Sequence, residues 1–113
     1  MIVSGIVEKG RGEAGPVYGL PTANIRVGAW FRPGIYAGKV TIDAGVFNAI
    51  VYYGMIDGLL EAHLFDFSGD LLGQTITVEI GSKVDDYEPF VSVQIMREKI
   101  EKDIKKVKVC LQE

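Results

Sequence analysis

The chain has 113 residues, 48% of them apolar, which is enough to bury one continuous core without disulfides or a structural metal. Charged residues make up 24% and the formal net charge is −3, so the composition does not favour a polyanionic partner. With Cys110 as the sole cysteine, an internal disulfide and a cysteine-rich metal site are both excluded. We expect one domain over residues 1–113.

No targeting or membrane segment is recognisable. The first residues carry neither a basic stretch nor a long apolar run, and no later stretch approaches the length of a membrane span. A lone cysteine also suits a reducing compartment. We therefore expect a cytoplasmic monomer with no membrane or nucleic-acid partner.

Strand-like segments follow one another from the N-terminus, separated by glycine-rich or aspartate-rich breaks. The clearest is residues 75–80, where apolar and polar residues alternate as in a strand with one buried face. Turn residues at 43–45 and 57–58 predict that neighbouring strands pair antiparallel. The predicted strands cover residues 2–8, 35–42, 46–53, 59–66 and 74–84.

The pattern changes at Ser92. Apolar residues then recur at three- and four-residue spacing as far as residue 111, which predicts an amphipathic helix. Ser92 is a suitable N-cap, because its hydroxyl can accept a hydrogen bond from a free N–H of the first turn. Several short strands cannot leave both sheet edges open, so we expect an all-β antiparallel barrel, closed or nearly closed, with the helix packed against it.

Residues 10–15 match the G-x-G-x-x-G pattern, which binds dinucleotides when a helix follows it. Pro16 and Pro21 prevent a regular helix at this point, so we reject the dinucleotide interpretation. A glycine-rich loop can still bind phosphate through its backbone N–H groups, with Arg11 adding positive charge. The pattern alone favours the alternative, a hairpin loop without a ligand.

The string Gly-Leu-Pro-Thr-Ala-Asn-Ile at residues 19–25 is the most specific in the sequence. Thr22 and Asn24 place a hydroxyl and a carboxamide two residues apart beside a rigid proline. Hard oxygen ligands of this kind suit Mg²⁺, which takes few protein ligands together with water and phosphate oxygens. Alternatively, both side chains satisfy backbone groups of a turn, as threonine and asparagine near proline commonly do.

This string resembles the G-F-P-T-A-N signature of riboflavin kinases, and further matches follow in that family's order. Residues 33–37, 61–67 and 70–73 are similar to the family's P-x-G-V-Y-A, E-V-H-L-L-D-F and D-L-Y-G segments, and residues 90–92 to its F-x-S before a C-terminal helix. The resemblance covers nearly the whole chain. It implies a six-stranded, Greek-key, closed antiparallel barrel and an enzyme that phosphorylates riboflavin to FMN with ATP.

The resemblance also implies roles for individual residues. Glu61 would be the general base, and His63 and Phe65 would share its face of the strand. Taken without the resemblance, Glu61 is better explained as a solvated strand residue than as a catalyst. His63 is likewise better explained as a structural hydrogen-bonding residue than as a catalyst or metal ligand. The remaining implied contacts are Thr22 and Asn24 with Mg²⁺; Gly10, Arg11, Gly12, Gly15, Pro21, Thr22 and Asn24 with the nucleotide; and Tyr87 and Phe90 with the flavin.

Two departures from the family pattern keep other functions open. Only residues 54–58 stand where the family carries an Asn-Pro-Thr-containing loop, and Asp85 stands where it has an arginine. One alternative is a flavin- or nucleotide-binding barrel without turnover, and another is a barrel used only for interactions. The adenylyltransferase domain of the bifunctional bacterial members has no counterpart in these residues, so we expect no FAD synthesis.

Overall fold

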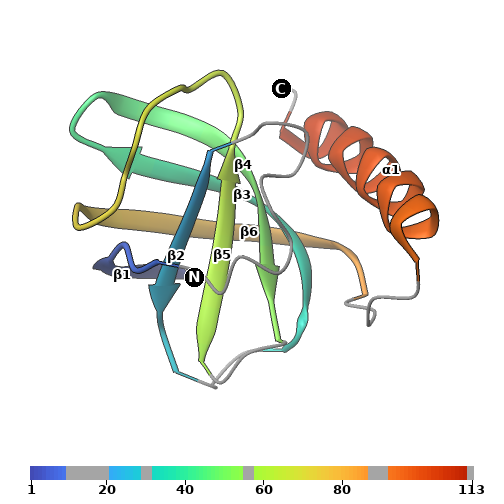
Figure 1. The fold of residues 1–113 in the computed structure, drawn as a ribbon, viewed down its shortest axis with the longest axis horizontal. Helices are drawn as coiled ribbons and strands as arrows, with labels where there is room; N and C mark the ends of the chain where they lie inside the picture. The colour runs from blue at the N-terminus through green and yellow to red at the C-terminus, as the bar shows by residue number, and fades with distance from the viewer. Residues whose placement is uncertain (10–20, 29–31, 55–57, 87–91, 112–113) are drawn as a thin grey trace.

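The computed structural model describes residues 1–9, 21–28, 32–54, 58–86 and 92–111. Their strands form one six-stranded antiparallel sheet in the order β1-β6-β3-β4-β5-β2, with a helix after the last strand (Figure 1). The predicted all-β fold with a C-terminal helix is confirmed. The elements are β1 (Ile2–Ile6), β2 (Thr22–Arg26), β3 (Gly34–Ile42), β4 (Gly45–Tyr53), β5 (Leu59–Leu64), β6 (Thr75–Asp85) and α1 (Val93–Leu111).

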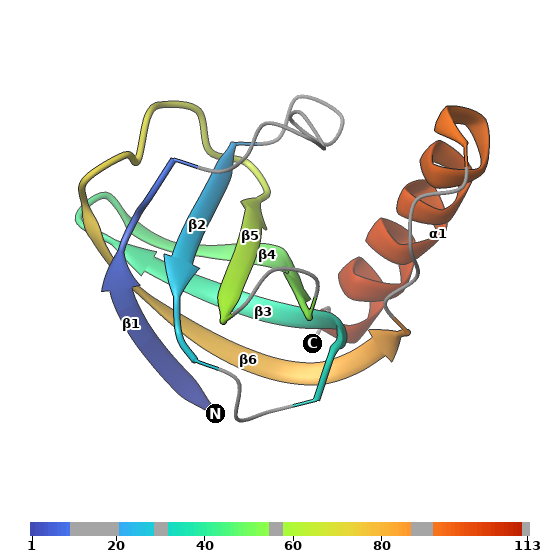
Figure 2. The ribbon, with the colours of Figure 1, turned by 60° about the horizontal axis from the view of Figure 1, so that its bottom comes forward.

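The sheet curls until its two edge strands, β1 and β2, lie next to each other (Figure 2). Beyond the end of β1, the backbone N–H of Glu8 donates to the carbonyl of Asn24 at 2.7 Å, which forms an antiparallel bridge to β2. The Glu8 carboxylate also pairs with the Arg26 guanidinium at 3.2 Å. The barrel is therefore nearly closed, with this bridge and this ion pair joining its two edges.

Alternate residues of every strand point into the barrel and form the main core. In β6 the predicted alternation is observed, because Ile76 and Val78 are buried while Thr75 and Glu79 are exposed. Burying one such aliphatic side chain stabilises the fold by about 1.5–3 kcal/mol. The fully buried members of this core include Ala23, Ile25, Val40, Val51, Leu60, Ala62, Leu64 and Val78.

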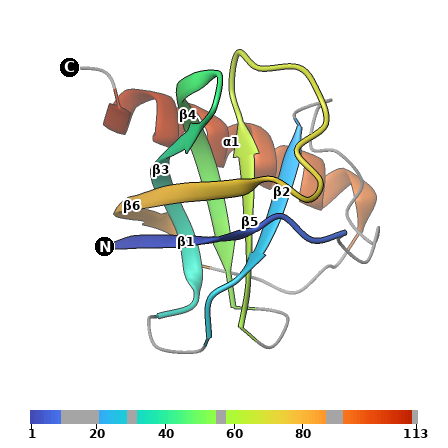
Figure 3. The same cartoon turned by 90° about the vertical axis from the view of Figure 1, so that its left-hand side faces the viewer.

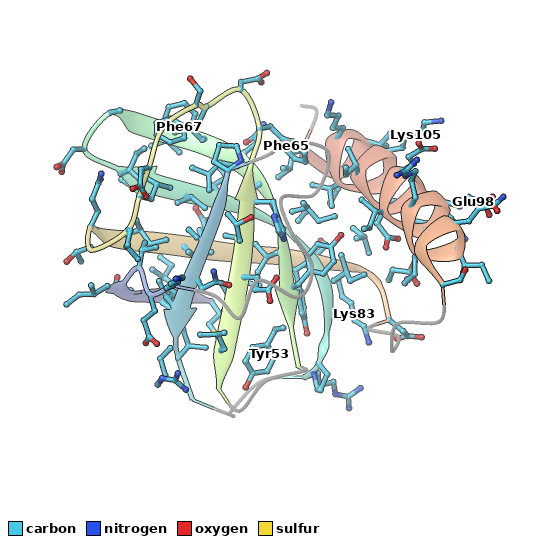
Figure 4. The ribbon with its side chains drawn as sticks, in the orientation of Figure 1. Tyr53, Phe65, Phe67, Lys83, Glu98 and Lys105 are labelled. Atoms are coloured by element: carbon cyan, nitrogen blue, oxygen red, sulfur yellow. The ribbon has the colours of Figure 1, made fainter. Side chains whose placement is uncertain are left out.

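The helix packs against the outside of the barrel, behind the strands in Figure 3. Val107 is fully buried there in a second apolar cluster with Ile35, Ala37, Ile50 and Phe65, and Figure 4 shows Phe65 between β5 and the helix. In the part of the chain that the structure describes, no helix has the length and apolar character needed to cross a bilayer.

The Ser92 hydroxyl accepts a hydrogen bond from the N–H of Ile95 at 3.1 Å, immediately before α1 begins. This bond satisfies one of the first-turn N–H groups that the helix cannot pair internally. The predicted N-cap is confirmed.

Strand β2 is the element that the residue pattern did not predict. It begins inside the 19–25 string and ends at Arg26, with Ala23 and Ile25 pointing into the core. Its five residues alternate polar and apolar and Arg26 is exposed, but a pattern this short directly after Pro21 fits a turn equally well. Its position gives the barrel the sixth strand that the family resemblance implied.

Gly38, in the middle of β3, lies where the neighbouring strands leave no room for a side chain. A Cβ atom at this position would lie 2.8 Å from Cγ2 of Val51 and 3.0 Å from the carbonyl oxygen of Glu79. We expect Gly38→Ala to lower the free energy of unfolding by about 1–3 kcal/mol, because the sheet must shift to relieve the overlap. Urea unfolding followed by circular dichroism measures this change.

Gly73→Ala is the matched control for Gly38→Ala. Nothing lies within 4 Å of its added Cβ, and only the positive φ of 82° opposes the substitution, so we expect a cost of about 1 kcal/mol. Equal stabilities of the Gly38→Ala protein and the original chain would show that β3 has room for a methyl group.

Candidate active site

Strands β2 and β5 are antiparallel neighbours (Figure 1), and their register sets polar residues of one strand opposite those of the other. Thr22 lies opposite His63, and Asn24 lies opposite Glu61. Residues two apart on a strand share a face, and the residues between these four point into the core, so the four lie on the outer face of the barrel. We call Thr22, Asn24, Glu61 and His63 the β2–β5 polar cluster.

His63 connects the two strands within this cluster. Its side chain is 1% exposed, with Nδ1 3.1 Å from Oγ1 of Thr22 and Nε2 3.7 Å from Oε2 of Glu61. The imidazole also meets the Tyr52 ring edge to face, with 5.2 Å between ring centroids. This position agrees with the structural hydrogen-bonding role expected from the sequence. The ring lies between the Thr22 hydroxyl and the Glu61 carboxylate.

Asn24 presents a buried oxygen that nothing in the described residues satisfies. The residue is 6% exposed, and its Oδ1 has no hydrogen-bond partner there. An unsatisfied buried acceptor costs about 1–3 kcal/mol, which makes this oxygen a candidate ligand-binding atom. The Glu61 side chain, opposite, is 28% exposed and so remains accessible from solvent.

The oxygen atoms of Thr22, Asn24 and Glu61 suit Mg²⁺ better than a softer metal. Among the described residues there is no group of three or more histidine, cysteine, aspartate and glutamate side chains that could enclose a metal. Mg²⁺ does not need such a cage, because it commonly takes one or two protein ligands and completes its shell with water and phosphate oxygens. The residues present therefore fit Mg²⁺ carried by a nucleotide.

Pro21 continues the β2–β5 pairing by one residue, because its carbonyl accepts a hydrogen bond from the N–H of Leu64 at 3.1 Å. This contact holds the chain in place just before Thr22. The other predicted ligand contacts lie outside the described residues: Gly10, Arg11, Gly12 and Gly15 for the nucleotide, and Tyr87 and Phe90 for the flavin.

A second set of charged residues joins the end of β6 to α1. Nζ of Lys99 lies 2.9 Å from Oδ2 of Asp85 and 3.3 Å from Oδ2 of Asp103. Nζ of Lys106 lies 3.6 Å from the same Asp85 oxygen and 3.4 Å from the carbonyl of Val84. We call Asp85, Lys99, Asp103 and Lys106 the β6–α1 charge cluster. The negative charge at the family's arginine position is thus paired with cations supplied by the helix.

The two carboxyl groups of this cluster have pKa values shifted in opposite directions. Burial, together with the neighbouring Asp85 carboxyl group, raises the pKa of Asp103 to about 6. The interaction with Asp103 is the main cause that lowers the pKa of Asp85, with contacts to Lys99 adding to it. Burial by itself lowers the pKa of Lys99, but its contacts with both carboxylates outweigh burial and the net shift is upward. As the pH falls, Asp103 is therefore protonated before Asp85.

The burial of Asp103 and its contacts with Lys99 were not predicted from the sequence, although a signal for them exists. It lies three residues after Ile100 and four before Val107, on the apolar stripe of the helix. A charged residue on that stripe must be buried with partners, and Asp103 is fully buried. A carboxylate on the core side of a helix thus predicts a polar contact across the interface.

A likeness in fold comes from a solved structure described as a macrolide-efflux protein from Streptococcus pneumoniae. It has a TM-score of 0.78, covers 95% of this chain and 36% of that one, and is 24% identical.

The sequence comparisons are more specific. The chain is 40% identical over 103 residues to a bifunctional riboflavin kinase/FMN adenylyltransferase of Haemophilus influenzae, covering 83% of this chain and 33% of that protein. It is 30% identical over 111 residues to the RNA-binding riboflavin kinase RibR of Bacillus subtilis, covering 91% of this chain and 48% of that protein. The chain thus spans between a third and a half of the length of these relatives. The family model for riboflavin kinase matches residues 1–111, and the chain therefore belongs to the riboflavin kinase family.

Proposed function

We propose that this chain transfers the terminal phosphoryl group of ATP to the ribityl 5′-hydroxyl of riboflavin, producing FMN and ADP. The observation that carries the proposal is the β2–β5 register, which brings Thr22 and Asn24 onto the same face as Glu61. Family membership supports the choice of riboflavin and ATP as substrates. Glu61 is the proposed general base, and Thr22 and Asn24 are the proposed ligands of the Mg²⁺ that accompanies the nucleotide.

Phosphoryl transfer to an alcohol needs positioning, neutralisation of phosphate charge and removal of one proton. Mg²⁺, when bound, would supply the neutralising charge. Glu61 would accept the hydroxyl proton as the ribityl oxygen bonds to the γ-phosphorus and the bond from that phosphorus to the bridging oxygen of ADP breaks. Its 28% exposed side chain leaves room for an incoming alcohol, while its neighbour His63 is buried and keeps it in position.

The direct test is incubation with riboflavin, Mg²⁺ and each nucleoside triphosphate in turn, followed by chromatography for FMN. We expect FMN with ATP and none after chelation of the metal. Flavin binding without FMN would instead support a binding barrel that lacks turnover. Absence of both flavin and nucleotide binding would support a barrel used only for interactions.

Thr22→Val tests the proposed metal ligand separately. Valine keeps the shape of threonine and removes the hydroxyl oxygen, so we expect the Mg²⁺ concentration for half-maximal rate to rise by about tenfold, as loss of roughly 1.4 kcal/mol of binding would give. Thr22→Ser keeps the hydroxyl and is the control, with a change of less than about threefold. An unchanged Mg²⁺ requirement in Thr22→Val would remove Thr22 from the metal site.

Four expectations from the sequence stay predictions: a single domain, a monomer, a cytoplasmic location and no nucleic-acid partner. The last is the most open to challenge, because one relative is described as RNA-binding. A net charge of −3 opposes a large phosphate interface on this chain. Titration of the chain with labelled RNA at low salt tests it, and tight binding would contradict it.

A further inference from the structure

His63 is the only histidine of the chain. It lies between Thr22, a proposed metal ligand, and Glu61, the proposed general base. Its Nδ1 faces the Thr22 hydroxyl at 3.1 Å, and its Nε2 faces the Glu61 carboxylate at 3.7 Å. Nε2 makes no hydrogen bond within the described residues and is buried from solvent. Within the part of the chain that the structure describes, the negative charge facing that nitrogen is the Glu61 carboxylate.

The two neutral forms of the ring are not equivalent in these surroundings. With the proton on Nε2, the N–H dipole points at a carboxylate, which is favourable. With the proton on Nδ1, the Nε2 lone pair faces a negative oxygen across 3.7 Å in a buried site, where the repulsion is weakly screened. The Nε2–H form is the one that Glu61 stabilises.

The position of that proton decides what Thr22 can offer to a ligand. A hydroxyl has one proton and two lone pairs. If Nδ1 carries no proton, it accepts the Thr22 O–H and leaves both oxygen lone pairs for other partners. If Nδ1 carries the proton, Nδ1–H donates to one lone pair of the Thr22 oxygen, and the Thr22 O–H must point away from the ring. The first arrangement suits a cation, and the second suits a phosphate oxygen.

We propose that His63 is a positioning residue that carries its proton on Nε2 and thereby holds the Thr22 hydroxyl as a lone-pair ligand for a divalent cation. The edge-to-face contact with Tyr52, at an interplanar angle of 77°, fixes the plane of the ring. The identity of the cation as nucleotide-bound Mg²⁺ rests on the proposed function, whereas the position of the proton does not.

The protonation state can be read from the free protein by nitrogen NMR after ¹⁵N labelling of histidine, and the signals are unambiguous because the chain has one histidine. At pH 7.5 we expect Nε2 to give a protonated, pyrrole-type signal and Nδ1 an unprotonated, pyridine-type signal. A proton on Nδ1, whether in the other neutral form or in the imidazolium, would overturn the proposal.

Thr22→Val supplies the second spectroscopic arm. Nε2 should stay protonated, while the Nδ1 signal should move towards that of an imidazole nitrogen with no donor. Addition of MgCl₂ and ADP should shift Nδ1 in the original chain and in Thr22→Ser but not in Thr22→Val. An Nδ1 signal that is the same in all three proteins, with and without MgADP, would show that Thr22 does not donate to His63.

Kinetics distinguish positioning from support of the fold. His63→Leu should raise the Mg²⁺ concentration for half-maximal rate by about tenfold and leave the KM for riboflavin within about twofold. The amide oxygen of His63→Asn can still accept from Thr22, so this variant should bring the Mg²⁺ requirement most of the way back to that of the original chain. A parallel loss of all kinetic parameters in both variants would contradict a positioning role. The Nδ1–H form together with normal FMN production would reject this inference alone, whereas the Nε2–H form without FMN production would reject the proposed function alone.

Discussion

Glu61→Gln should lower the turnover number for FMN formation by about two to four powers of ten while changing the affinities for riboflavin and nucleotide by no more than a few-fold. Glutamine keeps the size and shape of the side chain on β5 but cannot accept the proton of the ribityl hydroxyl. The effect should fall on turnover because the proton moves only as the phosphoryl group is transferred. Steady-state kinetics together with fluorescence titration of riboflavin separate these quantities.

Glu79→Gln is the matched control, since Glu79 is also a strand carboxylate but lies exposed on β6, outside the β2–β5 polar cluster. We expect its turnover to match that of the original chain. If Glu61→Gln retains full turnover, Glu61 is not the base, and Asp66 and Asp70 are the next carboxylates to test. A matched loss of substrate affinity would instead indicate that Glu61 supports the structure of the site.

Lys99→Met should lower the free energy of unfolding by about 3 kcal/mol at neutral pH, because it removes the cation that lies between the carboxylates of Asp85 and Asp103. Methionine keeps the apolar length of the side chain, so the loss reports mainly on charge. Lys106 remains near Asp85 but is the more exposed of the two lysines, with 38% of its side chain accessible compared with 15% for Lys99. Chemical unfolding at several pH values measures the difference.

The pH dependence follows from the direction of each shift. Folding raises the pKa of Asp103 from an ordinary 3.8 to about 6. The folded state therefore holds more protons between these values, and the contribution of Asp103 to stability falls as the pH rises through this window. The lowered pKa of Asp85 has the opposite effect, since its contribution is present above pH 4 and is lost as the pH falls further. The pair therefore favours folding most strongly near pH 4, where the two windows meet.

Asp103→Asn tests this sign. The amide keeps the size and shape of the side chain and cannot ionise, so the fall in stability between about pH 4 and pH 7 should flatten, with a gain on the order of 2 kcal/mol at pH 8. Asp86→Asn is the control, because Asp86 is 79% exposed and pairs with Lys83 three residues before it; its effect should stay below about 0.5 kcal/mol. An unchanged pH profile in Asp103→Asn would show that Asp103 is ionised throughout.

The candidate site was only partly predictable. Thr22, Asn24 and Glu61 were named from sequence strings and the family resemblance, but nothing in those strings states that β2 pairs with β5. Thr22 and His63 are 41 residues apart in the chain and 3.1 Å apart in space. The contact depends on a register between two strands, and a shift of one residue would turn every side chain of β2 to the other face.

The sequence by itself determined the local elements of this protein: the alternation in β6, the apolar stripe of α1 and its Ser92 cap. Each of these depends on residues only two to four positions apart, so the spacing along the chain contains the information. Tertiary structure alone decided which polar groups meet: His63 between Thr22 and Glu61, and Lys99 between Asp85 and Asp103. Those contacts depend on sheet register, helix docking and burial, which arise from distant parts of the chain and leave no regular spacing in the sequence.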